Sequence, residues 1–231
     1  MRTFTAIQPQ SATQIGEPPI ARFLFADTRM AWLWLIVRLY VGYQWLVAGI
    51  DKLTGHSIDI GSFGQSTGSP WVFTGHDGVQ LHGFIMGAIA QASGPHAAVQ
   101  SWYASFLQTF ILPNAGFLSY VVTFGEVLVG LGLIFGVLTG IAAFFGVFMN
   151  LNFLLAGAVS INPIIGGLAL FLVLAWRIAG YYGVDRWLLP LLGTPWTGSL
   201  ARTKEAEVTP VATVPTTKEK VEVVEAERVE K

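Results

Sequence analysis

Three ionisable side chains stand inside long apolar stretches of the sequence. Arg38, Glu126 and Arg177 each interrupt a run that is otherwise almost free of charge. A charge placed in hydrocarbon is costly unless it finds a partner or water, so such residues commonly mark routes for substrates or protons. A guanidinium stays charged, whereas a carboxyl group can bind or release a proton. Glu126 is therefore the group expected to titrate.

The depths of these residues are compatible with one cluster. On straight helices that rise about 1.5 Å per residue, Arg38, Glu126, Arg177 and Asn150 lie about 12, 18, 10 and 15 Å from the same side of the membrane. Two interpretations remain open. One is a structural ion pair between Arg38 and Glu126 that holds the helices together. The other is a site at which a substrate or a proton is handled.

Four segments are long and apolar enough to cross a membrane, which takes about 20 residues. They cover residues 30–50, 115–138, 140–159 and 163–184. Short connections join the last three, so neighbouring segments are expected to be antiparallel. The sequence therefore predicts an all-α fold, an integral membrane four-helix bundle over residues 30–190.

Polar and small residues fall on one stripe of each segment at 100° per residue. Small residues let helices approach closely in lipid, so each stripe predicts a face packed inside the bundle. The stripes comprise Arg38, Gly42, Trp45, Gly49 and Lys52 in the first segment, Ser119, Thr123, Glu126 and Gly130 in the second, Thr139, Ala143, Gly146, Asn150 and Gly157 in the third, and Gly166, Val173, Arg177 and Tyr181 in the fourth.

The remaining sequence divides into three parts. Residues 1–29 lack the features of a secretory signal and are expected to form a cytoplasmic N-terminal segment. The loop 51–114 contains two apolar runs, 79–92 and 101–112, which are too short to cross and are predicted as interfacial helices. Residues 191–231, rich in Thr, Pro, Val, Lys and Glu, predict a disordered cytoplasmic tail.

Composition and charge exclude several classes of protein. With 53% hydrophobic and 12% charged residues, the chain could not build the polar surface of a water-soluble domain. A net charge of −1 argues against nucleic acid as a partner. The absence of cysteine removes disulfides and Cys-ligated iron–sulfur clusters. Membrane lipid is therefore an expected partner.

Lysine and arginine are concentrated before the first predicted span and after the last. By the positive-inside rule, both termini are expected in the cytoplasm and the loop 51–114 on the outer side of the cell membrane. Lys52, at the outer end of the first span, has two interpretations, an interfacial anchor or a ligand for an anion from outside.

No metal site is predicted. All histidines lie in the loop 51–114, and none shows the i, i+4 spacing of a helical metal pair. The potential ligands in that loop are His56, His76, His82, His96, Asp51, Asp59 and Asp77.

Two motifs frame the predicted bundle. The first begins at Arg38 and reads RLYVGYQWLVAGIDKL. The second begins at Gly125 and reads GEVLVGLGLIFG, followed by Thr139-Gly140 and later by Met149-Asn150. Over about residues 30–182 the chain resembles the DoxX/DoxD family of small four-helix membrane proteins.

The resemblance implies a respiratory activity in which oxidation of thiosulfate to tetrathionate is coupled to reduction of a quinone. Glu126, Arg38 and Arg177 are then the implied catalytic residues, with Glu126 exchanging a proton. Arg38, Lys52 and Asn150 are expected to bind the anionic substrate. Quinone is the implied electron acceptor, and no bound cofactor is recognisable. A second oxidoreductase subunit and further copies of the chain are the expected protein partners.

Two other functions remain open from the sequence. A non-catalytic membrane anchor or assembly scaffold is favoured by the lack of a cofactor motif and by the charged tail. A small-anion transporter is the third hypothesis. Against it, the sequence shows neither an inverted repeat nor a span interrupted at its middle.

Overall fold

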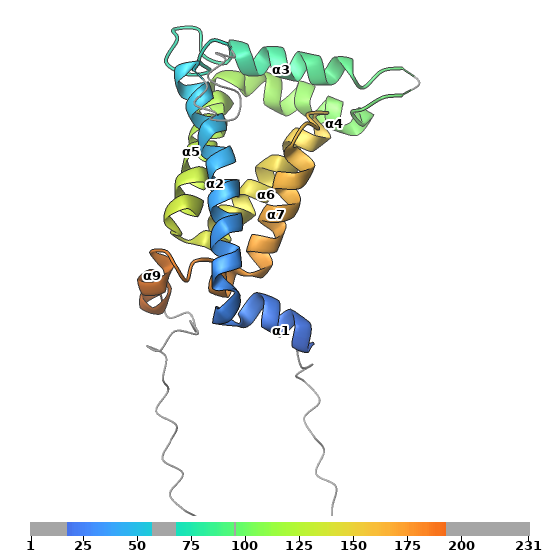
Figure 1. Ribbon diagram of the computed structural model, residues 1–231. Helices are drawn as coiled ribbons and strands as arrows, with labels where there is room; N and C mark the ends of the chain where they lie inside the picture. The colour runs from blue at the N-terminus through green and yellow to red at the C-terminus, as the bar shows by residue number, and fades with distance from the viewer. Residues whose placement is uncertain (1–17, 57–67, 95, 193–231) are drawn as a thin grey trace, which may run out of the picture. The chain divides into compact units, whose positions relative to one another are not determined.

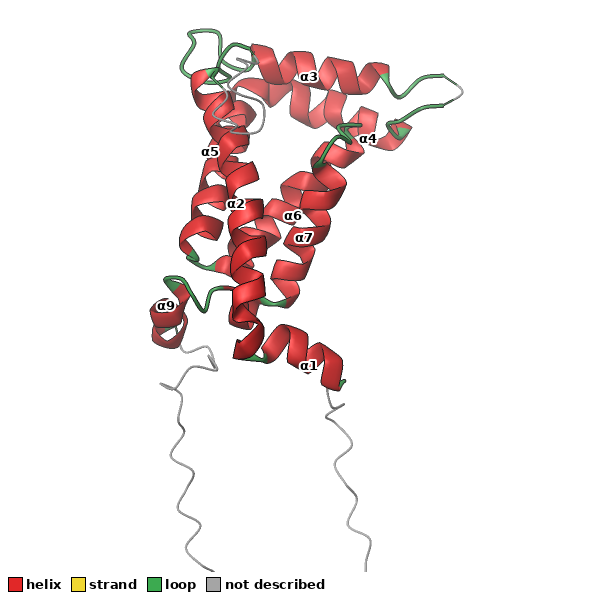
Figure 2. Ribbon diagram, viewed as in Figure 1, coloured by secondary structure: helices red, strands yellow, loops and turns green. Residues whose placement is uncertain are grey.

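The computed structural model describes residues 18–56, 68–94 and 96–192. These residues form helices joined by turns and loops, and no strand occurs among them, which confirms the predicted all-α fold for this part of the chain (Figure 2). Residues 1–17 and most of the predicted tail, 193–231, lie outside the described residues. The helices are α1 (Pro19–Ala26), η1 (Thr28–Met30), α2 (Ala31–Thr54), α3 (Val79–Ala90), α4 (Ser101–Phe106), η2 (Leu107–Ile111), η3 (Leu112–Asn114), α5 (Ala115–Phe135), α6 (Thr139–Leu155), α7 (Asn162–Leu174), α8 (Trp176–Ala179) and α9 (Asp185–Leu191).

The bundle is built from two helix pairs. α2 lies along α5, α6 lies along α7, and α5 also packs against α6 (Figure 1). α2 ends at Gly55 and α5 at Gly136, with φ values of 72° and 67° in the left-handed region. Glycine adopts this conformation without the steric cost that a Cβ atom brings, so it is suited to end a helix there. The hydrophobic core between the pairs includes Trp34, Val41, Trp45, Val129, Leu133, Ala143, Ala169 and Leu172.

The helices are apolar on their outer faces as well as in the core, unlike those of a water-soluble protein. The buried faces of α2, α5 and α6 match the three predicted stripes, apart from Lys52, whose side chain is 15% exposed, and Gly157, which follows α6. Large apolar side chains such as Phe117, Leu128 and Phe144 are exposed instead. Two helical stretches, Thr28–Thr54 and Ser101–Phe135, are long and apolar enough to cross a membrane. Apolar helices with an apolar exterior are suited to a lipid environment.

The second half of the bundle has shorter helices than predicted. α6 has 17 residues and α7 only 13. α7 ends at Ala175, and the chain resumes as the one-turn helix α8. The stripe predicted for the fourth segment is therefore wrong. The buried face of α7 consists of Ile165, Ala169 and Leu172 instead. Because α7 ends before Arg177, that residue does not continue the face.

The loop between α2 and α5 has its own small hydrophobic core. α3 lies across one end of the bundle beside α4 (Figure 1), and it buries one face at i, i+4 and i+7. The chain then passes through η2 and η3 directly into α5, so the second predicted interfacial helix is continuous with a span. The core comprises Leu81, Ile85, Ala88, Val99, Tyr103, Ala104, Leu107, Ala115 and Ala156.

The segment between Gly68 and Gly78 is fixed to the ends of α2 and α5. The Trp71 amide donates to the Lys52 carbonyl at 2.7 Å. The Asp77 carboxylate accepts from the Thr74 amide at 2.9 Å and from the Tyr120 hydroxyl. The hydrogen bond from Tyr120 lowers the pKa of Asp77 below its usual value. These contacts hold the Trp71 indole at the end of α2.

Candidate functional site

A buried ion pair connects the two longest helices. The Lys52 ammonium lies 2.7 Å from Glu126 Oε2, and the two side chains are 15% and 1% exposed. Lys52 stands in the last turn of α2, and Glu126 lies on the buried face of α5. The ammonium also donates to the Ala48 carbonyl at 3.4 Å. Both charged groups are thus satisfied by each other and by the backbone of α2.

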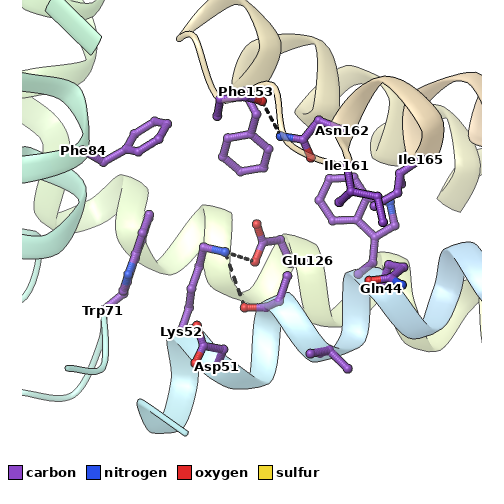
Figure 3. Close-up of a pocket in the computed structure, with 14 residues that line it drawn as sticks. Gln44, Asp51, Lys52, Trp71, Phe84, Glu126, Phe153, Ile161, Asn162 and Ile165 are labelled. Atoms are coloured by element: carbon purple, nitrogen blue, oxygen red, sulfur yellow. Dashed lines mark hydrogen bonds and ion pairs between the residues drawn. The ribbon is translucent and has the colours of Figure 1, made fainter. Parts of the chain in front are cut away.

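The pair faces a cavity of about 460 Å³ (Figure 3). Two aromatic rings flank the Lys52 ammonium, Trp71 at 5.1 Å and Phe153 at 5.9 Å from their centroids. Cations are attracted to aromatic faces at these distances. The wall is completed by α2, by α3 and by the turn between α6 and α7. The lining residues are Gln44, Trp45, Val47, Ala48, Asp51, Lys52, Trp71, Phe84, Glu126, Phe153, Ala158, Ile161, Asn162 and Ile165.

Two neutral polar side chains, Gln44 and Asn162, also line this cavity. The Asn162 carboxamide donates to the Ala158 carbonyl at 2.6 Å and accepts from Asn150 Nδ2 at 3.4 Å. Asn150 is buried on α6 and does not line the cavity. The predicted substrate ligand Asn150 therefore contacts the cavity wall through Asn162.

The composition of the cavity limits what it can accept. Most of its wall is aromatic or aliphatic. The charged side chains, Lys52, Glu126 and Asp51, lie together in one corner. Ligand sites commonly combine an apolar wall with a few polar groups that fix orientation. The arrangement suits a flat apolar molecule with a polar oxygen, and it places a carboxyl group able to exchange a proton beside a cation.

The predicted ion pair between Arg38 and Glu126 is wrong. Arg38 lies about 21 Å from Lys52 along α2 at about 1.5 Å per residue, so it faces the opposite end of α5. The Arg38 guanidinium donates instead to the carbonyls of Ala179 and Tyr182, each at 3.3 Å. The carboxyl group of Glu126 pairs with Lys52 instead. The sequence predicted that Lys52 lies on the same stripe of the first segment as Arg38.

Arg177 does not join either group. It lies on α8 after the break at Ala175, and its side chain is exposed. Its guanidinium stands 5.9 Å from the ring of the neighbouring Trp176. The predicted cluster of three intramembrane charges is therefore corrected to a cavity-facing pair of Lys52 and Glu126, with Arg38 and Arg177 elsewhere.

Arg38 belongs to a tightly packed junction that the sequence did not indicate. Its NH1 atom lies so close to Gly136 that a Cβ atom there would stand 1.9 Å from it. Asp185, fully buried, accepts from the amides of Leu138 and Thr139 at 2.6 and 2.7 Å. Asp185 thus caps α6 from more than 40 positions further along the chain. No local sequence signal points to such a distant cap.

Replacing Asp185 by alanine is expected to destabilise the protein by about 2 kcal/mol, because two amides at a helix start lose their acceptor. Denaturant titration in mild detergent measures the loss. Hydrogen exchange should accelerate at Leu138 and Thr139. A control replacement, Asp77→Ala, should leave exchange at these two amides unchanged. Equal exchange in the Asp185 variant and the parent protein would contradict the assigned cap.

The histidines do not assemble a metal site within the described ranges. No group of three or more His, Asp or Glu side chains suited to a metal ion occurs there. His76, His82 and His96 are exposed, and the His56 ring contacts the Thr54 carbonyl at 2.9 Å. Asp59 lies outside the described residues.

Comparison with known proteins places the chain in a family. No curated protein and no solved structure matches it. The DoxX family model matches residues 33–158, which extend from the start of α2 beyond the end of α6 and include both Lys52 and Glu126. The match covers more than half of the chain and agrees with the helical, apolar architecture. The chain therefore belongs to the DoxX family.

Proposed function

We propose that this DoxX protein is the membrane subunit of a thiosulfate:quinone oxidoreductase and that the quinone ring binds in the cavity beside Lys52 and Glu126. The observation that carries the proposal is the buried ion pair facing an aromatic cavity of about 460 Å³. An apolar ring is compatible with Trp71, Phe84 and Phe153. Its carbonyl oxygen is then within reach of the corner of the wall where the charged side chains lie.

The cavity-lining residues have separate roles in this reaction. Reduction of a quinone to a quinol takes two electrons and two protons. Glu126 delivers one proton to the reduced oxygen beside it and regains a proton from water, and water reaching the cavity supplies the second proton to the other oxygen. Lys52 stabilises the negative charge that develops on that oxygen, and it stabilises the Glu126 carboxylate once the proton has left. At 2.7 Å the two groups are close enough for a proton-coupled, charge-assisted hydrogen bond.

The electrons come from thiosulfate. Two thiosulfate ions give one tetrathionate and two electrons, which matches the need of one quinone. A second oxidoreductase subunit is the proposed carrier of this half-reaction, because a dianion is poorly accommodated beside Asp51 and Glu126 in an apolar cavity.

The proposed orientation places α1 and α9 on the cytoplasmic side of the cell membrane. Four exposed arginines lie on helices at that end, Arg22, Arg29, Arg177 and Arg186. Positive residues are enriched in cytoplasmic segments. The cavity then opens toward the outer side, where α3 lies.

Replacing Glu126 by glutamine tests the proposal. The variant keeps the shape of the side chain but cannot donate a carboxyl proton, so reduction of a soluble quinone analogue by thiosulfate is expected to fall at least about 100-fold. The assay uses membranes or detergent extracts that retain copurifying subunits. Asp27→Asn is the matched control, since it neutralises a carboxylate at the opposite end of the bundle that does not line the cavity.

Other outcomes assign other functions. Full activity in Glu126→Gln would remove the proton role from this residue. If no quinone is reduced with all partners retained, the protein acts as an anchor or scaffold. Thiosulfate uptake into proteoliposomes without a redox change would assign anion transport instead.

A further inference from the structure

A second concave site lies at the end of the bundle opposite α3. The residues of α1 and η1 enclose a groove of about 580 Å³. Two arginines, Arg22 and Arg29, line it together with Phe23. The other lining residues are Pro19, Ala26, Asp27 and Thr28. The groove therefore combines positive charge with apolar surface.

The groove is held in a fixed position on the bundle. The Trp34 indole donates to the Leu24 carbonyl at 2.8 Å, and the Phe25 ring stacks on Trp34 at 5.5 Å and on Phe171 at 6.4 Å. Both Leu24 and Phe25 pack against the bundle core. α1 thus presents its remaining face, including the exposed Ile20 and Phe23, away from the bundle.

The arginines of the groove retain donors for a ligand. The Asp27 carboxylate accepts from Nε of Arg29 at 3.1 Å and from its NH2 atom at 2.9 Å. The Arg29 side chain is nevertheless 79% exposed. Within the part of the chain that the structure describes, the NH1 atom of Arg29 contacts no acceptor and is available to a ligand. The Arg29 guanidinium also stands 5.9 Å from the Phe23 ring, so charge and apolar surface are adjacent.

The charge distribution of the described residues indicates an anionic ligand. Four exposed arginines lie on helices at the end of the bundle that carries the groove. The carboxylates near them are Asp27, bound to Arg29, and the buried Asp185. At the opposite end lie Asp51, Asp77 and the neutral pair of Lys52 with Glu126. Among the described residues, the positive charge that would attract an anionic ligand is therefore concentrated at the end that carries the groove.

We propose that the groove between α1 and η1 binds the headgroup of an anionic phospholipid, with Arg22 and Arg29 on its phosphate and Phe23 beside its acyl chain. A lipid fits better than a free anion because apolar side chains border the arginines, and because an amphipathic helix at a membrane surface contacts headgroups and acyl chains together. This site is separate from the quinone cavity.

Native mass spectrometry of the full-length protein in detergent tests this proposal with phosphatidylglycerol and phosphatidylcholine. The parent protein is expected to retain phosphatidylglycerol in preference. Arg22→Gln should weaken retention about fivefold, the contribution of one basic residue at an anionic surface. Arg22→Lys should restore most of it. Arg186→Gln on α9, an equal loss of charge outside the groove, should leave retention unchanged.

Four results would overturn the proposal. These are unchanged retention in Arg22→Gln, an equal loss in Arg186→Gln, equal retention of phosphatidylcholine, and displacement of the lipid by an equal concentration of inorganic phosphate. The second indicates a general charge effect, the third an apolar surface alone, and the fourth a site for a free anion. Thermal unfolding of each variant verifies that it is folded, and Arg29→Gln provides a second variant of the groove.

Discussion

Replacing Lys52 by methionine is expected to lower the free energy of unfolding by about 3–5 kcal/mol, the usual loss when one partner of a buried ion pair is removed. Methionine fills a similar volume but leaves the Glu126 carboxyl, 1% exposed, without its partner at 2.7 Å. The loss is measured by titration with a denaturing detergent in mixed micelles. Quinone reduction is expected to fall with it, because the cavity loses its cation.

The exposed pair of Arg29 with Asp27 supplies the matched control. Its side chains are 79% and 24% exposed, so Arg29→Gln should cost about 1 kcal/mol or less. The double replacement Lys52→Met with Glu126→Leu should regain most of the lost stability while remaining inactive, because no buried charge is left. A loss in Lys52→Met no larger than that in Arg29→Gln would mean that the pair is not buried.

Replacing Gly130 by alanine is expected to destabilise the bundle by about 1–3 kcal/mol through overpacking. A Cβ atom on Gly130 would stand 2.6 Å from the Leu46 amide nitrogen and 2.7 Å from the Leu46 Cα atom. These are backbone atoms of α2, so they cannot move aside like a side chain. α2 and α5 must separate, and that separation also pulls Lys52 from Glu126, so both stability and quinone reduction should decrease.

Gly167 provides the control for this helix contact. It lies in α7, and a Cβ atom there would meet no atom within 4 Å. Gly167→Ala should therefore be neutral or stabilising by up to about 1 kcal/mol, since alanine favours the helix. Equal behaviour of the two variants would show that α2 and α5 do not approach as closely at Gly130 as the structure indicates.

The lengths and the periodicity of the apolar segments were sufficient to predict several features of this protein. The all-α fold and the helices within the loop follow from the lengths of the apolar runs, and the buried stripes of the first three predicted spans follow from side chains repeating at 100° per residue. The motif from Arg38 to Leu53, with the Gly125-Glu126 pair, was sufficient to indicate the DoxX family. These features depend on residues near one another in sequence, so a single sequence contains them.

The pairing of charges could not be predicted in the same way. The predicted depths and buried stripes put Arg38 and Lys52 on one helix and Glu126 on the helix that faces it. Which of the two pairs with Glu126 depends on how far α2 is shifted along α5. That shift is set by close backbone approach at Gly42, Gly49 and Gly130. A stripe gives the direction in which a residue faces but not its height against the neighbouring helix.

The sequence by itself determined the buried faces of α2, α5 and α6 and the family to which the chain belongs. Only the tertiary structure decided that Lys52 neutralises Glu126 beside a cavity, that Asp185 caps α6, and that Arg177 lies after a break in the fourth segment. The physical reason is that burial follows from local amphipathic pattern, whereas ion pairs and distant caps require the packed position of helices far apart in the chain.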